Sequence, residues 1–215
     1  MFIDMHSHST VSDDARATPE AYMKWIQVLR KKGYRVDGIV LTEHRTFDIK
    51  SDYADLSLEA GVKIFKGSEL DTIYGHILLY GSNIKLMELF DFSKVDLDTE
   101  ELLIVARKKG GIVIPAHPGR FGVGLVAHFE KGATINGLEI IETYNSSNRS
   151  GEQKRAEGLA EKMDLNSIGG SDAHFPSSIG TTLTEFFDPI DSMNDLVEAL
   201  IAGRCRPVSL EDTRW

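Results

Sequence analysis

The stretch Asp4-Met5-His6-Ser7-His8-Ser9-Thr10-Val11-Ser12-Asp13 stands near the start of the chain, directly after a short apolar run. It holds two histidines separated by one residue, and an aspartate follows five residues after the second. Imidazole nitrogens and carboxylate oxygens gathered in this way suit a metal better than a hydrophobic core. The pair alone is weak evidence, because two surface histidines in an extended segment would look the same. The interpretation as part of a metal site therefore depends on residues further along the chain.

Length and composition favour a single soluble globular domain over residues 1–215. Hydrophobic residues make up 41% of the chain and charged residues 27%, both ordinary for a globular protein, and no Pro/Ser-rich linker divides it. No apolar run approaches the ~20 residues that cross a bilayer, and the opening Phe2-Ile3-Asp4 shows no export signal. We therefore expect a cytoplasmic protein without membrane contact.

Net charge and cysteine content restrict the partners and the metal ligands. A net charge of −9 argues against binding along a nucleic-acid backbone, which requires a basic face. It is compatible with a small phosphorylated substrate, because bound cations reverse the local sign. Cys205 is the only cysteine, so His, Asp and Glu would hold a metal. We expect a small phosphorylated substrate and no bulk nucleic-acid binding, and the oligomeric state is left open.

Predicted strands and helices alternate along the chain. Thr18-Pro19-Glu20 is typical of a helix start, and Gly33 ends that helix after about Lys32. An apolar run at 36–41 predicts a buried strand. Further strands are expected at 2–5, 62–65, 74–80, 112–114, 137–141, 165–169, 182–187 and 207–210, and further helices at 51–60, 99–109, 124–131, 150–163 and 193–202. This alternation predicts an α/β fold with a largely parallel sheet.

Most histidines and several acids fall at the ends of these predicted strands. They are His6, His8, His44, Glu69, His117, Asp172 and His174. If the strands are parallel, all of these side chains emerge at one rim and converge on one site. His76 is a weaker candidate because it lies within a predicted strand, and His128 lies in a predicted helix and is interpreted as an ordinary histidine.

The candidate acids differ in how directly the sequence implicates them. Asp172 lies one residue from His174 in a glycine-containing turn, and the carboxylate of Glu69 could bridge two cations. Four further acids either orient the histidines or are plain surface residues, and the sequence leaves this open. They are Asp4, Glu43, Glu139 and Glu142.

Several of these segments together resemble a known family. They are His6-Ser7-His8 through Ser12-Asp13, Thr42-Glu43-His44, Glu69 with His76, Pro115-Ala116-His117-Pro118, and Gly170-Ser171-Asp172-Ala173-His174. In order and rough spacing they resemble the four motifs of the PHP (polymerase and histidinol phosphatase) superfamily, with a match that extends to about Arg206. The short spacing from Glu69 to His76 is similar to its stand-alone phosphoesterase branch.

The resemblance implies a single PHP domain built as a distorted (β/α)7 TIM-like barrel, with divalent metals at the C-terminal rim. It implies one metal on His6, His8, Glu69 and Asp172, a second on Glu69, His76 and His117, and a third on Asp13, His44 and His174. The family often has Ser-Asp-Gly where this chain has Ser12-Asp13-Asp14, so Asp14 stays open as an alternative ligand.

The expected chemistry is phosphoester hydrolysis by a metal-activated hydroxide. A cluster of two or three cations lowers the pKa of a water towards ~7 and neutralises charge on the phosphoryl oxygens. Histidine-rich ligation favours Mn, Fe or Zn over Mg. Arg120 is the preferred phosphate-binding residue, ahead of Arg45 and Arg149. His117, His174 or a metal-bound water could act as general acid.

Two other functions compete with this interpretation. The chain could be a non-catalytic metal-binding domain that serves a protein partner, although candidates for all three sites are present. It could also be a metal-dependent amidohydrolase, which would usually have a bridging lysine after a strand. Lys66 is the only lysine near such a position, and it precedes Glu69. Monoester and diester substrates remain open.

Overall fold

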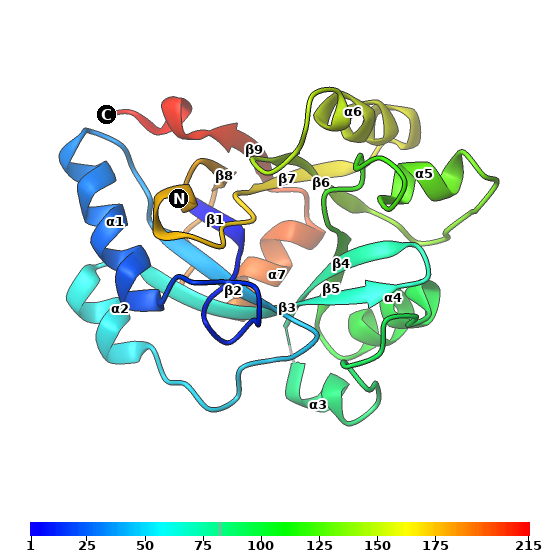
Figure 1. Cartoon of the computed structure of the whole chain (residues 1–215), viewed down its shortest axis with the longest axis horizontal. Coiled ribbons are helices and arrows are strands. Elements are labelled where there is room, and N and C mark those ends of the chain that lie inside the picture. Colours follow the sequence, from blue (N-terminus) through cyan, green and yellow to red (C-terminus); the bar gives the residue numbers. More distant parts are fainter. Residues whose placement is uncertain (82) are drawn as a thin grey trace.

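In the computed structural model, which describes residues 1–81 and 83–215, most strands join one mixed sheet. The strands are β1 (Phe2–Ser7), β2 (Gly38–His44), β3 (Lys63–Thr72), β4 (Gly75–Tyr80), β5 (Ile112–Pro115), β6 (Ile140–Asn145), β7 (Asn166–Gly170), β8 (Thr182–Phe186) and β9 (Cys205–Ser209). The main sheet has the order β5-β4-β3-β2-β1-β8-β9, and β6 and β7 form a separate parallel pair (Figure 1).

Most helices lie around the outside of the sheet, and α7 (Met193–Ile201) lies in its interior (Figure 1). The helices are α1 (Pro19–Lys31), α2 (Ala54–Ala60), α3 (Asn83–Met87), α4 (Thr99–Lys108), α5 (Leu125–Phe129), α6 (Glu152–Met163) and α7 (Met193–Ile201), with short 3-10 turns at Pro176–Ser178 and Leu210–Thr213. The helix α1 begins as expected, since the Thr18 hydroxyl accepts a hydrogen bond from the Ala21 N–H, and Gly33 after its end has φ +90°.

Strand directions differ from the expected largely parallel sheet. The strands β1, β2 and β3 are parallel, whereas β4 runs antiparallel to β3 and β8 runs antiparallel to β1. The reason is local for β4, because only Ile73 and Tyr74 separate it from β3, and so short a connection forms a hairpin. The expected parallel sheet is therefore wrong in this part, and the sheet is mixed.

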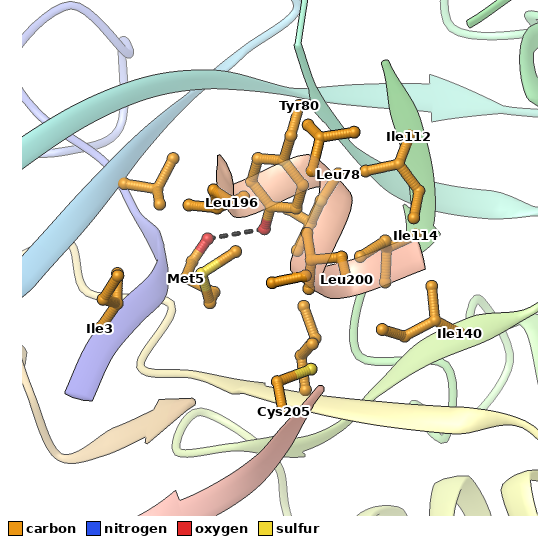
Figure 2. Close-up of a cluster of buried hydrophobic side chains, with 14 of the residues drawn as sticks. Ile3, Met5, Leu78, Tyr80, Ile112, Ile114, Ile140, Leu196, Leu200 and Cys205 are labelled. Atoms are coloured by element: carbon orange, nitrogen blue, oxygen red, sulfur yellow. Dashed lines mark hydrogen bonds between the residues drawn. The ribbon is translucent and has the colours of Figure 1, made fainter. Parts of the chain in front are cut away.

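The sheet curls into a half-barrel around α7. Buried residues from its opposite edges, among them Ile114 of β5 and Cys205 of β9, belong to one core cluster with Leu196 and Leu200 of α7. Figure 2 shows these side chains around the helix. The hydroxyl of Tyr80 donates a 2.7 Å hydrogen bond to the Met5 carbonyl within this cluster. An apolar helix thus fills the interior that the curled strands enclose.

The expected (β/α)7 barrel is confirmed only in its coarser form, as an α/β fold with a curled sheet. The β6–β7 pair contacts β5 on one side and the β8–β9 edge on the other, yet in the described residues it forms a sheet of its own. A single bridge between Ser7 and Ala173 joins the end of β1 to the segment after β7. The ring of hydrogen bonds that defines a closed barrel is therefore incomplete.

The strand directions place several chain segments at one rim. The ends of β1, β2 and β3 lie side by side because these strands are parallel, and the start of β4 lies next to the end of β3 because they form a hairpin. The end of β5 is paired with the start of β4, and the Ser7–Ala173 bridge brings the end of β7 to the same rim. Within the described residues, none of the helices is both long enough and apolar enough to span a bilayer.

Candidate metal centre

Four buried side chains meet at the rim in the first donor group. They are His6, His8, Glu69 and Asp172, and one ligand atom from each lies within 4.8 Å of the others. The Nε2 atoms of His6 and His8 are 3.1 Å apart. Each of these atoms lies 3.3 Å from Glu69 Oε2, and the Asp172 Oδ1 atom is 3.5 Å from His6 and 3.3 Å from His8. This arrangement of two imidazoles facing two carboxylates suits a divalent cation.

A second group shares Glu69 with the first. It comprises Glu69, His76 and His117. The other carboxylate oxygen, Oε1, lies 2.9 Å from His76 Nδ1 and 2.9 Å from His117 Nε2. The two oxygens of Glu69 therefore face different sets of imidazoles. A carboxylate in this position is suited to bridging two metal ions.

The third group contains His8, His44 and His174. The nearby carboxylate is that of Asp14, whose Oδ2 atom lies 3.3 Å from the Nε2 atoms of both His44 and His174. The side chain of Asp13 is 80% exposed and lies 3.7 Å from Arg45. The expectation that placed Asp13 here needs correction in favour of Asp14. The turn in which the Ser12 N–H donates to the Ser9 carbonyl directs Asp13 outward and brings Asp14 back over the histidines.

The two neighbouring aspartates provide a matched pair of variants. We expect Asp14→Asn to lower metal affinity at the third group about tenfold or more, because an ionised ligand facing two imidazoles is lost. Asp13→Asn should leave metal binding unchanged. The measurement is metal content after dialysis at graded free Mn²⁺ concentrations. Equal losses in both variants, or a loss in Asp13→Asn alone, would restore Asp13 as the ligand.

Electrostatics keep the buried carboxylates of this centre ionised. Burial by itself would raise the pKa of Glu69, but the imidazoles of His6, His117 and His76 hold that pKa well below its ordinary value. Burial likewise opposes the charged form of His6, and the carboxylates of Glu142, Asp172 and Glu69 outweigh it and raise its pKa. A divalent cation at the centre would likewise favour the ionised form of these carboxylates.

The tautomers of two histidines leave Nε2 available for a metal. The Nδ1 atom of His6 lies 3.0 Å from Glu142 Oε1, and the Nδ1 atom of His174 lies 2.9 Å from the carbonyl oxygen of Asp172. A carbonyl oxygen can only accept, so Nδ1 of His174 carries the proton, and the carboxylate of Glu142 favours the same tautomer for His6. The Nε2 lone pairs then point at the donor groups, as metal-binding histidines require.

Three buried acids outside the donor groups hold the rim in place. Glu142 accepts hydrogen bonds from the His117 N–H at 2.7 Å and from the Asn145 amide at 2.9 Å, besides its contact with His6. Glu43 accepts from the N–H and hydroxyl of Ser9 and from the Ser12 hydroxyl. Asp4 accepts from the N–H groups of Ser171 and Gly180. These three acids thus orient the segments that carry the donor residues. Glu139 does not take part, and it pairs with Arg107 at the surface.

Backbone conformation at the centre is unusual. His117 and Asp172 both have positive φ, at 31° and 54°, a region that residues with side chains rarely adopt. Such strain persists only where surrounding contacts fix it, and it is concentrated at functional sites. Sequence reasoning also missed Asp71, whose Oδ1 atom lies 3.0 Å from His76 Nε2. It stands two residues after Glu69 in β3, so a longer predicted strand would have placed both on one face.

The three candidate arginines lie in different settings. Arg120 forms an ion pair with Oδ2 of Asp172, at the edge of the first donor group. Arg45 lies 3.7 Å from Asp13 and 3.5 Å from Asp71, further out on the rim. Arg149 is exposed, its backbone N–H donates to the Glu152 carboxylate, and its carbonyl accepts from the Glu152 N–H. Arg120 is therefore the one arginine of the three whose guanidinium pairs with a donor-group side chain, whereas Arg45 contacts Glu69 only from its backbone N–H to the Glu69 carbonyl.

We expect Arg120→Ala to raise KM for a phosphate ester about tenfold or more, because the variant loses a charge-assisted hydrogen bond to the phosphate. Metal content should be unchanged, because Arg120 holds Oδ2 of Asp172 whereas Oδ1 faces the histidines. Arg107→Ala, which breaks the remote pair with Glu139, serves as the control. The measurements are KM from steady-state kinetics and the bound metal content of each variant. Loss of metal or an unaltered KM in Arg120→Ala would count against a substrate-binding role.

Comparison with known proteins bears on the identity of the chain. A family model described as PHP-associated matches residues 151–205. This segment, which contains Asp172 and His174, is thus similar to a PHP-associated region. This match confirms the resemblance to the PHP superfamily drawn from the histidine and acid motifs. A search of curated proteins finds no match.

Solved structures share the fold of the chain at low sequence identity. PsfC from Pseudomonas syringae has a TM-score of 0.69 and 21% identity, over 99% of this chain and 92% of that one. A protein from Bifidobacterium adolescentis, which has been assigned as a metal-dependent phosphoesterase, has a TM-score of 0.58 and 17% identity, over 98% of both chains. Endonuclease Q, in complex with a 27-mer duplex that has an abasic lesion at the active site, has a TM-score of 0.63 and 16% identity, over 95% of this chain and 57% of its own.

The similarity to endonuclease Q corrects one expectation from the sequence. We expected a small phosphorylated substrate and no bulk nucleic-acid binding, on the basis of net charge. That expectation is wrong, because a protein of the same fold holds duplex DNA at its active site. Net charge describes the whole molecule, whereas cations bound at a rim determine the local field that a phosphate meets.

Proposed function

We propose that the chain is a metal-dependent phosphoester hydrolase. The observation that carries the proposal is a set of three donor groups at one rim. Two are His/carboxylate groups that share Glu69, and the third consists of three histidines with the Asp14 carboxylate beside two of them. Histidine-rich groups favour Mn, Fe or Zn over Mg, and three groups offer positions for two or three cations. The likeness to a protein titled a metal-dependent phosphoesterase supports this choice.

The metal ions and the residues of the chain would have separate roles in the reaction. When bound, divalent cations would supply hydroxide at neutral pH by lowering the pKa of a water, and would neutralise charge on the phosphate. Arg120 would bind a phosphoryl oxygen by charge-assisted hydrogen bonds from its guanidinium. Glu142 would keep the imidazole of His6 in its metal-binding tautomer. His174 is more exposed than His117 and would be better placed to exchange a proton with the leaving group.

The substrate class extends to nucleic acids. Endonuclease Q, which shares the fold, is bound to duplex DNA, so we include phosphodiesters of nucleic acids beside monoesters. We treat residues 1–215 as one PHP domain and place it in the cytoplasm, both as proposals.

Amidohydrolase activity is a second candidate. An amidohydrolase from Chromobacterium violaceum, with bound sulfate and no metal, has a TM-score of 0.60 and 18% identity, over 96% of this chain and 97% of that one. Such an enzyme usually uses a lysine as a bridging ligand, and the candidate from the sequence is Lys66. The ammonium of Lys66 instead donates to the carbonyls of Asp48 and Ser51. We therefore favour phosphoester hydrolysis.

The test combines metal analysis with a substrate panel. Protein loaded with Mn²⁺ is assayed with an aryl phosphate monoester, an aryl phosphate diester, duplex DNA with and without an abasic lesion, and an N-acyl amide. We expect cleavage of at least one phosphoester, abolished by a chelator and restored by Mn²⁺. Cleavage of the amide alone would favour the amidohydrolase, and turnover of nothing by metal-loaded protein would favour a non-catalytic metal-binding domain.

A further inference from the structure

A hollow of about 400 Å³ opens beside the second donor group. It lies between the β3–β4 hairpin and the segment 122–128, and His76 forms part of its wall. Its volume falls within the range of about 300–1,000 Å³ that small-molecule sites occupy. Another hollow, of about 220 Å³, lies at the amino ends of β5 and β6, and its lining includes no residue of the donor groups. The hollow beside His76, here called the hairpin hollow, adjoins the metal centre because His76 belongs to both.

Three aliphatic side chains line the hairpin hollow while they remain exposed. Ile73, Val95 and Val123 come from three separate segments and are between 44% and 63% exposed. Single exposed aliphatic residues are common and need no explanation. Three that converge on one concave surface beside a metal centre form a local apolar patch, which favours contact with an apolar group.

The floor of the hairpin hollow is fixed by a close backbone approach. A Cβ atom on Gly75 would lie 2.6 Å from the Val123 carbonyl oxygen, and Gly75 has φ +99°. The hairpin and the segment around Val123 can come this close only because Gly75 has no side chain. On the far wall, the ring of His128 packs edge-on against Tyr74 at 5.7 Å between centroids. The hollow is therefore formed before any ligand binds.

Charges within the hairpin hollow argue against a second anionic group. The structure gives its described lining neither a lysine nor an arginine. Its acid, Asp71, already contacts His76 at 3.0 Å and Arg45 at 3.5 Å. A second phosphate or carboxylate placed there would meet this acid without a cation of its own. An uncharged apolar group would meet Ile73, Val95 and Val123 and would lose little hydration.

We infer that the hairpin hollow binds an uncharged apolar substituent of the phosphoester, such as an aromatic ring or a short aliphatic chain. This inference rests on the proposed function, because the phosphate itself would lie at the donor groups. The hollow then sets specificity at this one position: an apolar group of the ester binds in it, and a charged group lies elsewhere on the rim. The hairpin hollow thus contributes binding free energy on one side of the metal centre and does not contact the reacting atoms.

Equilibrium binding of two phosphonates tests the inference without any turnover. Phenylphosphonate and methylphosphonate carry the same charged group and cannot be hydrolysed as esters. For Mn²⁺-loaded protein, isothermal titration should give a Kd for phenylphosphonate about tenfold or more below that for methylphosphonate, since the ring buries apolar surface in the hollow. Val123→Asp and Val95→Asp should abolish this preference and leave the Kd of methylphosphonate unchanged.

The control is Val11→Asp, which adds the same charge at another exposed valine near the rim, outside the hollow. It should retain the preference. Equal binding of both phosphonates by the wild type, or an equal weakening of both in Val123→Asp, would overturn the hollow as a specificity site while leaving phosphate binding intact. Binding of neither phosphonate by protein shown to carry Mn²⁺ would overturn the proposed function, and this inference with it.

Discussion

Glu69→Gln is expected to remove metal binding from two donor groups at once. Its two oxygens face different imidazoles, with Oε2 near His6 and His8 and Oε1 near His76 and His117. Gln keeps the size of the side chain but loses its charge and one acceptor oxygen. Replacing a residue that only supports a metal ligand lowers metal affinity or activity about 10–100-fold. Removing a ligand shared by two metals should therefore lower metal affinity by more than about 100-fold.

Thermal unfolding with and without Mn²⁺ gives this prediction a readout besides activity. A ligand present at a hundredfold excess over its Kd stabilises by about 2.7 kcal/mol, which corresponds to a rise in Tm of about 5–10 °C for a chain of this size. The wild type should show that rise and Glu69→Gln should not. Glu152→Gln is the matched control, because Glu152 is buried and bonded to the N–H groups of Phe121 and Arg149 but belongs to no donor group. A Glu69→Gln protein with normal metal content would refute the shared-ligand interpretation.

Local sequence signals predicted most elements of the fold. The Thr18-Pro19 start and the Gly33 end of α1 are properties of short segments, and the structure places that helix at Pro19–Lys31. The structure brings together the side chains that the sequence placed at strand ends, because parallel strands align their carboxyl ends. All three donor groups contain residues named from the sequence. Local pattern and strand direction together were enough to bring distant histidines to one rim.

Features that depend on contacts between distant segments could not be predicted. The predicted strand at 137–141 stopped one residue short of Glu142, whereas β6 covers Ile140–Asn145 and turns Glu142 towards His6. The incomplete closure of the barrel depends on how β6 and β7 pack, which no single segment encodes. The choice between Asp13 and Asp14 depends on one turn at Ser9–Ser12, which Glu43 holds from another strand.

Gly170→Ala is expected to lower both stability and metal affinity, although it adds a single methyl group. The new Cβ would lie 2.4 Å from His6 Cβ, 2.9 Å from His6 N and 2.7 Å from Glu142 Oε1, and real Cβ atoms essentially never come that close. The neighbours are β1 backbone and a hydrogen-bonded carboxylate, so neither can easily move away. Overpacking of this kind costs about 1–3 kcal/mol. Displacing Glu142 from His6 should weaken metal binding about 10–100-fold.

Gly158→Ala is the matched control for that change. Gly158 lies within the helix α6, and a Cβ there would meet nothing within 4 Å. Alanine should stabilise this helix by about 0.5–1 kcal/mol, because glycine loses more backbone entropy on folding. The two substitutions are chemically identical and should therefore move the free energy of unfolding, measured by urea titration of metal-free protein, in opposite directions. If Gly170→Ala unfolds like the wild type and takes up Mn²⁺ normally, the tight contact between β7 and the His6–Glu142 pair cannot be what positions the metal centre.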